Sequence, residues 1–138
     1  MDFEKLEKKI KVEFKSKALL KEALTHRSYL NENPNWGQHN ERMEFLGDAV
    51  LELITTEYLY QKYPKATEGE LTAFRAALIN YQMLAQVAQE IDLEKYIFLS
   101  KGEAKDTGKA RESILANAFE ALTAGIYLDQ GYKIVQDF

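Results

Sequence analysis

The chain of 138 residues contains no cysteine, only two prolines and only seven glycines. The absence of cysteine excludes disulfides, thiolate metal ligands and a cysteine nucleophile, and it suits a reducing cytoplasm. No apolar run approaches the roughly 20 residues that a membrane-spanning helix needs, and the charged N-terminus is unlike a secretory signal peptide. We therefore expect a cytoplasmic protein with no membrane association.

The scarcity of proline and glycine also argues against long loops and low-complexity tracts. With 46% hydrophobic and 29% charged residues, residues 1–138 are predicted to form one globular domain. The formal net charge is −4. Taken alone, that charge disfavours a nucleic-acid partner, because binding to a phosphate backbone usually needs a basic surface.

Apolar residues recur with helical spacing along almost the whole chain, and no pair of strand-like runs is joined by a hairpin turn, so an all-α fold is predicted. Ser16 is the expected N-cap of the second helix, and Thr67 with Glu70 forms a capping box. Pro64 should end the longest helix, and Gly131 should interrupt the chain before a last helical turn. The main helical segments expected are residues 40–63, 71–91 and 110–129, with a polar loop over 101–109.

Residues 39–54 read HNERMEFLGDAVLELI and place three carboxylates in a largely apolar helix. Glu41, Glu44 and Asp48 are spaced i, i+3 and i+7, so they project from one face. Apolar residues spread around most of this helix, which predicts that it is largely buried. Gly47 costs about 1 kcal/mol relative to alanine, which is explained if another helix approaches closely there. A solvated acidic stripe is the simpler alternative, but clustered buried carboxylates require a cation such as Mg²⁺ or Mn²⁺.

A second polar pair could complete such a site. Asn117 and Glu120 are i, i+3 on one edge of the predicted helix over residues 111–129. Glu68 is a further candidate, although its place in a first helical turn is equally well explained by the helix dipole. Setting aside Glu68, Glu120 and the three acids of residues 41–48 from the 22 acidic residues leaves 17 against 18 basic ones. The net acidity can therefore reside in one metal site.

The stretch NERMEFLGDAVL closely resembles the signature helix of the ribonuclease III family, whose pattern is NER-x-EFLGDAVL. Four further segments resemble that family in the same order along the chain. They are ALTHRSYLNEN (23–33), YPKATEGELTAFRAALIN (63–80), LSKGEAKDTGKARESILANAFEAL (99–122) and GIYLDQGY (125–132). The similarity covers essentially the whole chain.

This resemblance implies an all-α nuclease domain that acts as a homodimer on double-stranded RNA. It implies Mg²⁺-dependent cleavage, with Mn²⁺ as a substitute, that leaves 5′-phosphate and 3′-hydroxyl ends with short 3′ overhangs. Ribosomal RNA processing is the usual task of the family. By motif correspondence, the resemblance assigns metal binding to Glu44, Asp48 and Glu120, and accessory roles to Glu41 and Glu68.

Three further assignments concern the partner subunit, the RNA and the histidines. Phe45 matches the residue that packs into the partner subunit in the family, although burial within its own chain is equally compatible with the periodicity. Basic residues near the closing catalytic helix are candidate phosphate contacts, although solvated loop residues are the simpler explanation; they are Lys101, Lys105, Lys109 and Arg111. His26 and His39 are expected to be structural, since metal-activated water needs no histidine base.

The chain departs from the family pattern in two ways. Asn117 stands where an aspartate is usual, which keeps an oxygen ligand but removes a negative charge. No double-stranded-RNA-binding domain follows residue 138, so we expect weak, salt-sensitive RNA binding. The alternative function is a catalytically silent, dimeric RNA-binding module of the same fold. A di-iron helical bundle is disfavoured because the chain has no Glu-x-x-His sequence.

Overall fold

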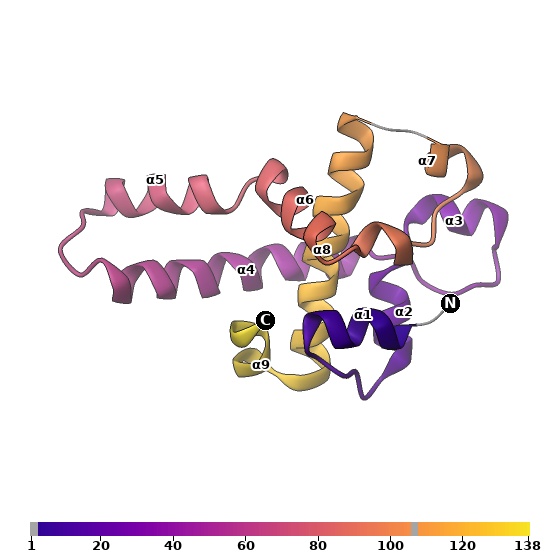
Figure 1. The fold of residues 1–138 in the computed structure, drawn as a ribbon, viewed down its shortest axis with the longest axis horizontal. Coiled ribbons are helices and arrows are strands. Elements are labelled where there is room, and N and C mark those ends of the chain that lie inside the picture. Colours follow the sequence, from indigo (N-terminus) through magenta and orange to yellow (C-terminus); the bar gives the residue numbers. More distant parts are fainter. Residues whose placement is uncertain (1–2, 106–107) are drawn as a thin grey trace.

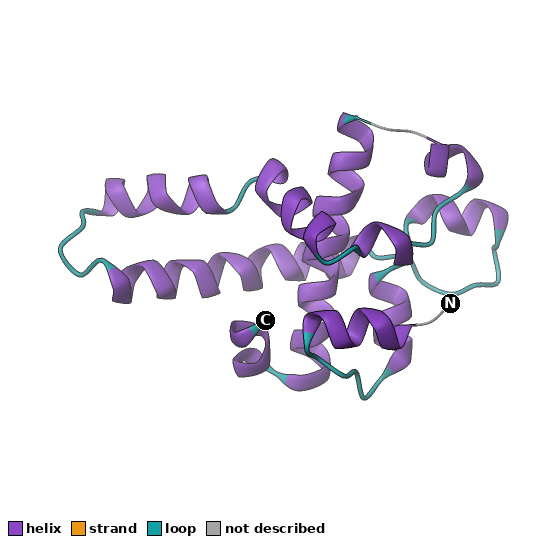
Figure 2. Ribbon diagram, viewed as in Figure 1, coloured by secondary structure: helices purple, strands orange, loops and turns teal. Residues whose placement is uncertain are grey.

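A computed structural model describes residues 3–105 and 108–138, and of Lys109 only the backbone. These residues form helices and contain no strand, which confirms the all-α prediction (Figure 2). The elements are α1 (Phe3–Ile10), α2 (Lys17–Ala23), α3 (Arg27–Glu32), α4 (Glu41–Lys62), α5 (Glu68–Leu78), α6 (Tyr81–Glu90), the 3₁₀ helix η1 (Leu93–Tyr96), α7 (Lys101–Lys105), α8 (Lys109–Gln130) and α9 (Tyr132–Asp137).

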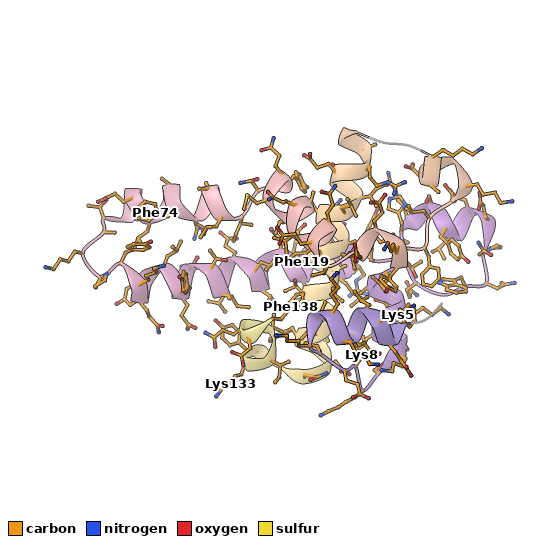
Figure 3. The ribbon with its side chains drawn as sticks, in the orientation of Figure 1. Lys5, Lys8, Phe74, Phe119, Lys133 and Phe138 are labelled. Carbon is orange, nitrogen blue, oxygen red and sulfur yellow. The ribbon has the colours of Figure 1, made fainter. Side chains whose placement is uncertain are left out.

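Helix α8 is the centre of the core, because every residue from Ile114 to Ile126 except Asn117 is buried. Helices α2, α4, α6 and α9 pack around it, and α4 makes the most extensive contact. Figure 1 shows α4 and α8 crossing near the middle of the molecule. The ring of Phe119 on α8 stacks on Phe138 with the centroids 5.5 Å apart (Figure 3), which fastens α9 to the core.

The crossing of α4 and α8 depends on Gly47. A Cβ atom at this position would lie 1.7 Å from the backbone oxygen of Glu120, closer than any real contact. The close helix approach predicted from the sequence is therefore confirmed. Because the contact is with backbone, no side-chain rotation can make room for a larger residue.

The start of α4 is fixed by a network around Asn40. The buried Asn40 donates from Nδ2 to the carbonyl of Ala23 at 3.0 Å, and its backbone N–H donates to Thr25 at 2.9 Å. Thr25 also forms an isolated parallel bridge with Phe98. The rings of Trp36 and Phe98 pack with centroids 4.9 Å apart. These contacts determine where the acid-bearing helix begins.

The second half of α4 and all of α5 form a projecting arm, residues 53–78, that extends from the rest of the molecule (Figure 1). Helix α5 has no buried residue. Its N-terminus carries the predicted capping box of Thr67 and Glu70, and the rings of Tyr63 and Phe74 meet at 5.2 Å. The arm nevertheless exposes large apolar side chains, namely Leu53, Tyr58, Tyr60, Tyr63, Phe74 and Leu78.

The prediction that the acid-bearing helix is largely buried is wrong for the single chain. Only Met43, Gly47, Val50 and Leu59 of α4 are buried, and Phe45 is 83% exposed. The apolar residues do surround the helix, but α8 covers only one side of its first half. Periodicity alone cannot distinguish a face that packs inside the subunit from a face left for another subunit.

The single helix expected over residues 71–91 is also wrong, because the chain turns between α5 and α6 at residues 79 and 80. Asn80 produces the turn with both ends of its side chain. Its Nδ2 donates to Ala76 and Ala77 at the end of α5, and its Oδ1 accepts from the backbone of Met83 at 2.9 Å. One asparagine thus caps two helices.

The remaining boundary predictions are mostly confirmed. Ser16 caps α2, and Gly131, with φ of +91°, separates α8 from α9. The expected polar loop over 101–109 instead begins with the short helix α7, while residues 106 and 107 lie outside the described residues. None of the helices in the described part of the chain combines the length and the apolar character needed to cross a membrane.

We predict that Gly47→Ala destabilises the fold by about 3 kcal/mol or more, because the added methyl group collides with the backbone of Glu120. Urea unfolding at fixed protein concentration measures this change. Gly69→Ala is the matched control, since its nearest neighbour is the Thr67 hydroxyl oxygen at 3.9 Å, and its stability should be equal or slightly higher. Equal stabilities for the two variants would contradict the proposed role of Gly47.

Candidate metal centre and nucleic-acid interface

Four carboxylates from two helices line one hollow beside the α4–α8 crossing. Helix α4 contributes Glu41, Glu44 and Asp48, and α8 contributes Glu120; the volume of the hollow is about 400 Å³. The backbone contact at Gly47 sets how near Glu120 lies to the α4 carboxylates. The sequence-predicted acids at positions 41, 44, 48 and 120 therefore meet at one place.

The carboxylates of this acid hollow perturb each other. Burial, a hydrogen bond to Asp48 and the charges of Asp48 and Glu44 raise the pKa of Glu120 to about 8. Burial and the charges of Glu41 and Asp48 also raise the pKa of Glu44. At neutral pH without a cation, the Glu120 carboxyl therefore holds a proton for much of the time.

Little positive charge from the protein opposes this cluster. Arg27 pairs with Glu41 at 3.3 Å, and both side chains are mostly exposed. Within residues 3–105 and 108–138, no ion pair involves Glu44, Asp48 or Glu120. A bound divalent cation would supply the missing charge and displace the proton from Glu120.

A second hollow of about 510 Å³ adjoins the first. Glu41 and Glu44 line both hollows, whereas Asn117 and His26 line only the second. The Asn117 Oδ1 atom is buried and has no hydrogen-bond partner among the described residues. Asn117 therefore faces a different side of Glu44 from Glu120.

The donor set fits a hard cation such as Mg²⁺, since it consists of carboxylate oxygens and one orphaned amide oxygen. In this arrangement of the described side chains, no three acidic or histidine groups are close enough to enclose an ion. Holding an ion here would therefore require the carboxylate side chains to rotate toward one another.

Glu68 is not brought to the acid hollow of its own chain. It begins α5 at the far end of the arm, beyond Lys62. Asp48 and Lys62 are 14 residues apart in one helix, which corresponds to about 21 Å at 1.5 Å per residue. Glu70, by contrast, is used locally, because its carboxylate accepts from the backbone of Thr67 at 3.1 Å.

The candidate RNA contacts differ in whether their side chains are already bound by other protein groups. The Arg111 guanidinium pairs with Glu94 at 2.7 Å and also donates to the carbonyls of Glu103 and Ala104. It therefore holds α7 and η1 against α8 rather than facing solvent. Lys101 and Lys105 are exposed at the two ends of α7, and the side chain of Lys109 lies outside the described residues.

Sequence reasoning missed residues that line the acid hollow from the turn between α5 and α6. Asn80 and Tyr81 lie there opposite the α4 acids, and the Tyr81 side chain is 55% exposed. The sequence feature that marks this turn is Asn80, since asparagine is a preferred N-cap and so indicates the start of a new helix. Recognising it would have divided the 71–91 segment correctly.

Comparisons with known proteins point to one family. A family profile described as Ribonuclease-III-like matches residues 16–138. The chain is 50% identical over 134 residues to a Ribonuclease 3 from Nitratiruptor sp., covering 97% of this chain and 57% of that protein. It is 48% identical to a Ribonuclease 3 from Oceanobacillus iheyensis, covering 100% of this chain and 61% of that protein. The chain thus spans about three-fifths of the length of these curated relatives.

Solved structures give the same result. The nuclease domain of ribonuclease III from Campylobacter jejuni superimposes with a TM-score of 0.90 at 42% identity, covering 99% of this chain and 92% of that one. That structure is described as flexible in the region involved in dimer formation. Dicer from Pichia stipitis superimposes with a TM-score of 0.65 at 29% identity, covering 89% of this chain and 51% of that one.

We predict that Glu120→Gln changes how stability depends on pH. The pKa of Glu120 rises from 4.5 to about 8 on folding, so the metal-free fold is favoured below the lower value and loses this advantage as pH rises toward 8. The variant should equal the original chain near pH 4 and exceed it at pH 9 by up to about 5 kcal/mol, at about 1.4 kcal/mol for each pH unit between the two pKa values. Urea unfolding in EDTA measures this, and a stability difference independent of pH would contradict the prediction.

Proposed function

Because the chain belongs to the ribonuclease-III-like family, we propose that residues 1–138 form one catalytic domain of a metal-dependent endoribonuclease for double-stranded RNA. The observation that carries this proposal is the meeting of the α4 carboxylates with Glu120 at the Gly47 crossing. The proposed products have 5′-phosphate and 3′-hydroxyl ends with short 3′ overhangs. Cytoplasmic precursor RNAs, ribosomal ones included, are the proposed substrates.

Glu44, Asp48 and Glu120 are the proposed Mg²⁺ ligands, and Asn117 supplies a neutral oxygen from the second hollow. When bound, the cation lowers the pKa of a coordinated water and neutralises charge at the scissile phosphate. The protein contributes the positions of the carboxylates and controls the proton on Glu120. Glu120 has to lose its proton to become a ligand, and Glu44 connects the two hollows because it lines both.

Electrostatics alone does not exclude an RNA partner for this acidic chain. Its net charge of −4 includes the four carboxylates of the acid hollow. A divalent cation offsets two of those charges where the RNA backbone would approach. The charges outside the hollow sum to about zero. The basic residues among them can contact phosphates, and that part of the binding should weaken as salt rises.

A homodimer accounts for two features that a single chain leaves unexplained. The first is the apolar surface of the arm together with Phe45, which is 83% exposed beside the acid hollow. The second is Glu68, which lies too far along the arm to assist Asp48 of its own chain. In a two-fold dimer, the arm of one subunit can deliver Glu68 to the acid hollow of the other. Phe45 is then the proposed seam residue, and Glu41 an accessory acid.

The alternative is a catalytically silent, dimeric RNA-binding module. The specific observation in its favour is Asn117, which lowers the negative charge beside Glu44. Against it stands the retention of every carboxylate in the acid hollow. A domain that only bound RNA would gain nothing from four clustered carboxylates that repel phosphate.

We predict that the chain cleaves a long perfect RNA duplex at low salt with Mg²⁺ and not with EDTA. Glu120→Gln should lower the rate about 100-fold or more, because it removes a ligand charge. Asn117→Asp should bind Mg²⁺ about tenfold more tightly, as measured by calorimetry. If the original chain and both variants bind RNA but leave it uncut, the silent-module alternative is correct.

We predict that two inactive chains restore activity when mixed and allowed to exchange subunits. In a heterodimer of Glu68→Gln and Glu120→Gln chains, one acid hollow has its own Glu120 and the partner's intact Glu68. With equal amounts and free exchange, about half of the dimers are heterodimers and each has one complete site, so about a quarter of all sites should be functional. If Glu68 acts within its own chain, no site is complete and mixing restores nothing.

The same experiment tests whether Phe45 lies in the dimer interface. Adding Phe45→Ser to both chains should remove the restored activity, because the apolar contact that brings the arm to the other subunit is weakened. Sedimentation of the Phe45→Ser chain should show dissociation to monomers at concentrations where the original chain is dimeric. If mixing still restores cleavage activity when the Phe45→Ser chains are monomeric, the proposed dimer is contradicted.

A further inference from the structure

His26 lines the second hollow but has no part in the proposed metal chemistry. It is the N-cap of α3, and its Nδ1 accepts the backbone N–H of Ser28 at 3.2 Å. The same nitrogen lies 2.8 Å from the Ser28 Oγ. Ser28 Oγ in turn accepts the backbone N–H of Ser100 at 3.0 Å. These contacts link α3 to the segment that leads into α7.

The network determines which ring nitrogen of His26 carries the proton. A backbone N–H can only donate, so Nδ1 is an acceptor. Because the Ser28 hydroxyl oxygen already accepts from Ser100, its own hydrogen is free to donate to the same Nδ1. The single proton of the neutral imidazole is therefore on Nε2. Burial, which lowers the pKa of His26, supports the neutral form.

The His26 ring lines the second hollow, and its Nδ1 is engaged by Ser28. The Nε2–H is therefore the donor that the ring has left for a ligand in the hollow. No described residue hydrogen bonds to Nε2, and Asn117 Oδ1 in the same hollow is also without a partner. The titratable groups that act on His26 are Glu103 and Glu41, which are negative, Arg27, which pairs with Glu41, and His39. The hollow thus combines a neutral donor and a neutral acceptor with the carboxylate of Glu44.

We propose that His26 is a substrate-binding residue that donates its Nε2–H to an oxygen of the RNA backbone in the second hollow. The proposal rests on the proposed function, because it takes double-stranded RNA as the ligand. A lysine at this place would be held by Glu41, Glu44 or Glu103. A neutral N–H is not captured in that way, so it remains available beside the acids. The oxygen belongs either to a phosphate or to a ribose 2′-hydroxyl, and both accept the same hydrogen bond.

Two substitutions separate the structural role of His26 from the proposed one. Asparagine places an oxygen where Nδ1 lies, so His26→Asn keeps the α3 cap and removes the Nε2–H. Glutamine places an amide nitrogen near Nε2, so His26→Gln keeps a donor and loses the cap. His26→Asn should keep its melting temperature within about 2 °C and lose about tenfold in kcat/KM for duplex RNA. His26→Gln should melt about 3 °C or more lower and retain most of its activity per folded molecule.

His39 provides the matched control. Its Nδ1 also accepts a backbone N–H, that of Glu41 at 3.3 Å, but its ring lines another hollow, beside Phe45 and Leu128. His39→Asn should therefore leave kcat/KM unchanged. The inference is overturned if the original chain cleaves RNA and His26→Asn cleaves it equally well. That result leaves the proposed nuclease function standing.

A second readout does not require cleavage. The chain has two histidines, so imidazole ¹⁵N spectra of the original chain and His39→Asn identify the His26 signal. It should report the Nε2–H form, and the Nε2 shift should move when a duplex is added with Ca²⁺ in place of Mg²⁺. An Nδ1–H form, or an Nε2 signal that RNA does not move, overturns the inference even if no cleavage is found. RNA duplexes with a single 2′-deoxy sugar near the cleavage site identify the oxygen: a defect of His26→Asn that disappears in one of them indicates the hydroxyl, and one that persists in all of them indicates the phosphate.

Discussion

The rest of the site depends on one contact, the approach of Gly47 to the backbone of Glu120. Without it, α4 would carry three carboxylates on one face and α8 would carry a fourth some distance away. With it, four acids from two helices share one hollow. The contact is possible because α8 is rich in buried alanine, including Ala118 and Ala121, and because glycine removes the last side chain between the two helices.

This packing forces like charges together, and the resulting repulsion is seen in the pKa values. The Glu120 carboxyl is favoured in its protonated form and Glu44 is shifted in the same direction. A fold that only needed stability would not retain this arrangement, since an apolar residue at position 120 would pack beside Gly47 without repulsion. The unfavourable electrostatics support the proposal that the hollow is the metal site, because a bound cation would turn the repulsion into coordination.

Local features were predictable from the sequence, and features that depend on neighbours were not. Ser16 and the Thr67–Glu70 capping box act through contacts that a short pattern specifies. Gly47 predicted a close helix approach, but the partner, the backbone of Glu120, could not be named from the sequence. The exposure of α4 was not predictable, since apolar residues around a helix look the same whether the covering surface belongs to the same chain or to another. Likewise, the spacing of Asn117 and Glu120 predicted a shared edge of α8. It did not reveal that they face separate hollows, because that division is made by where α4 crosses the helix.

In the proposed dimer, the arm links subunit assembly to the chemistry of the site. An 11-residue helix is marginal by itself in water, and α5 buries none of its residues against the subunit core. Within the chain its position rests on its capping box, on Arg75, which donates to Thr56 at 2.9 Å, and on the Tyr63–Phe74 contact. A partner that covered the apolar side of the arm would stabilise the whole helix at once. Because Glu68 begins that helix, the proposed dimer would order the arm and deliver the proposed accessory acid in one event, and a monomer would hold the four acids of the hollow without the fifth.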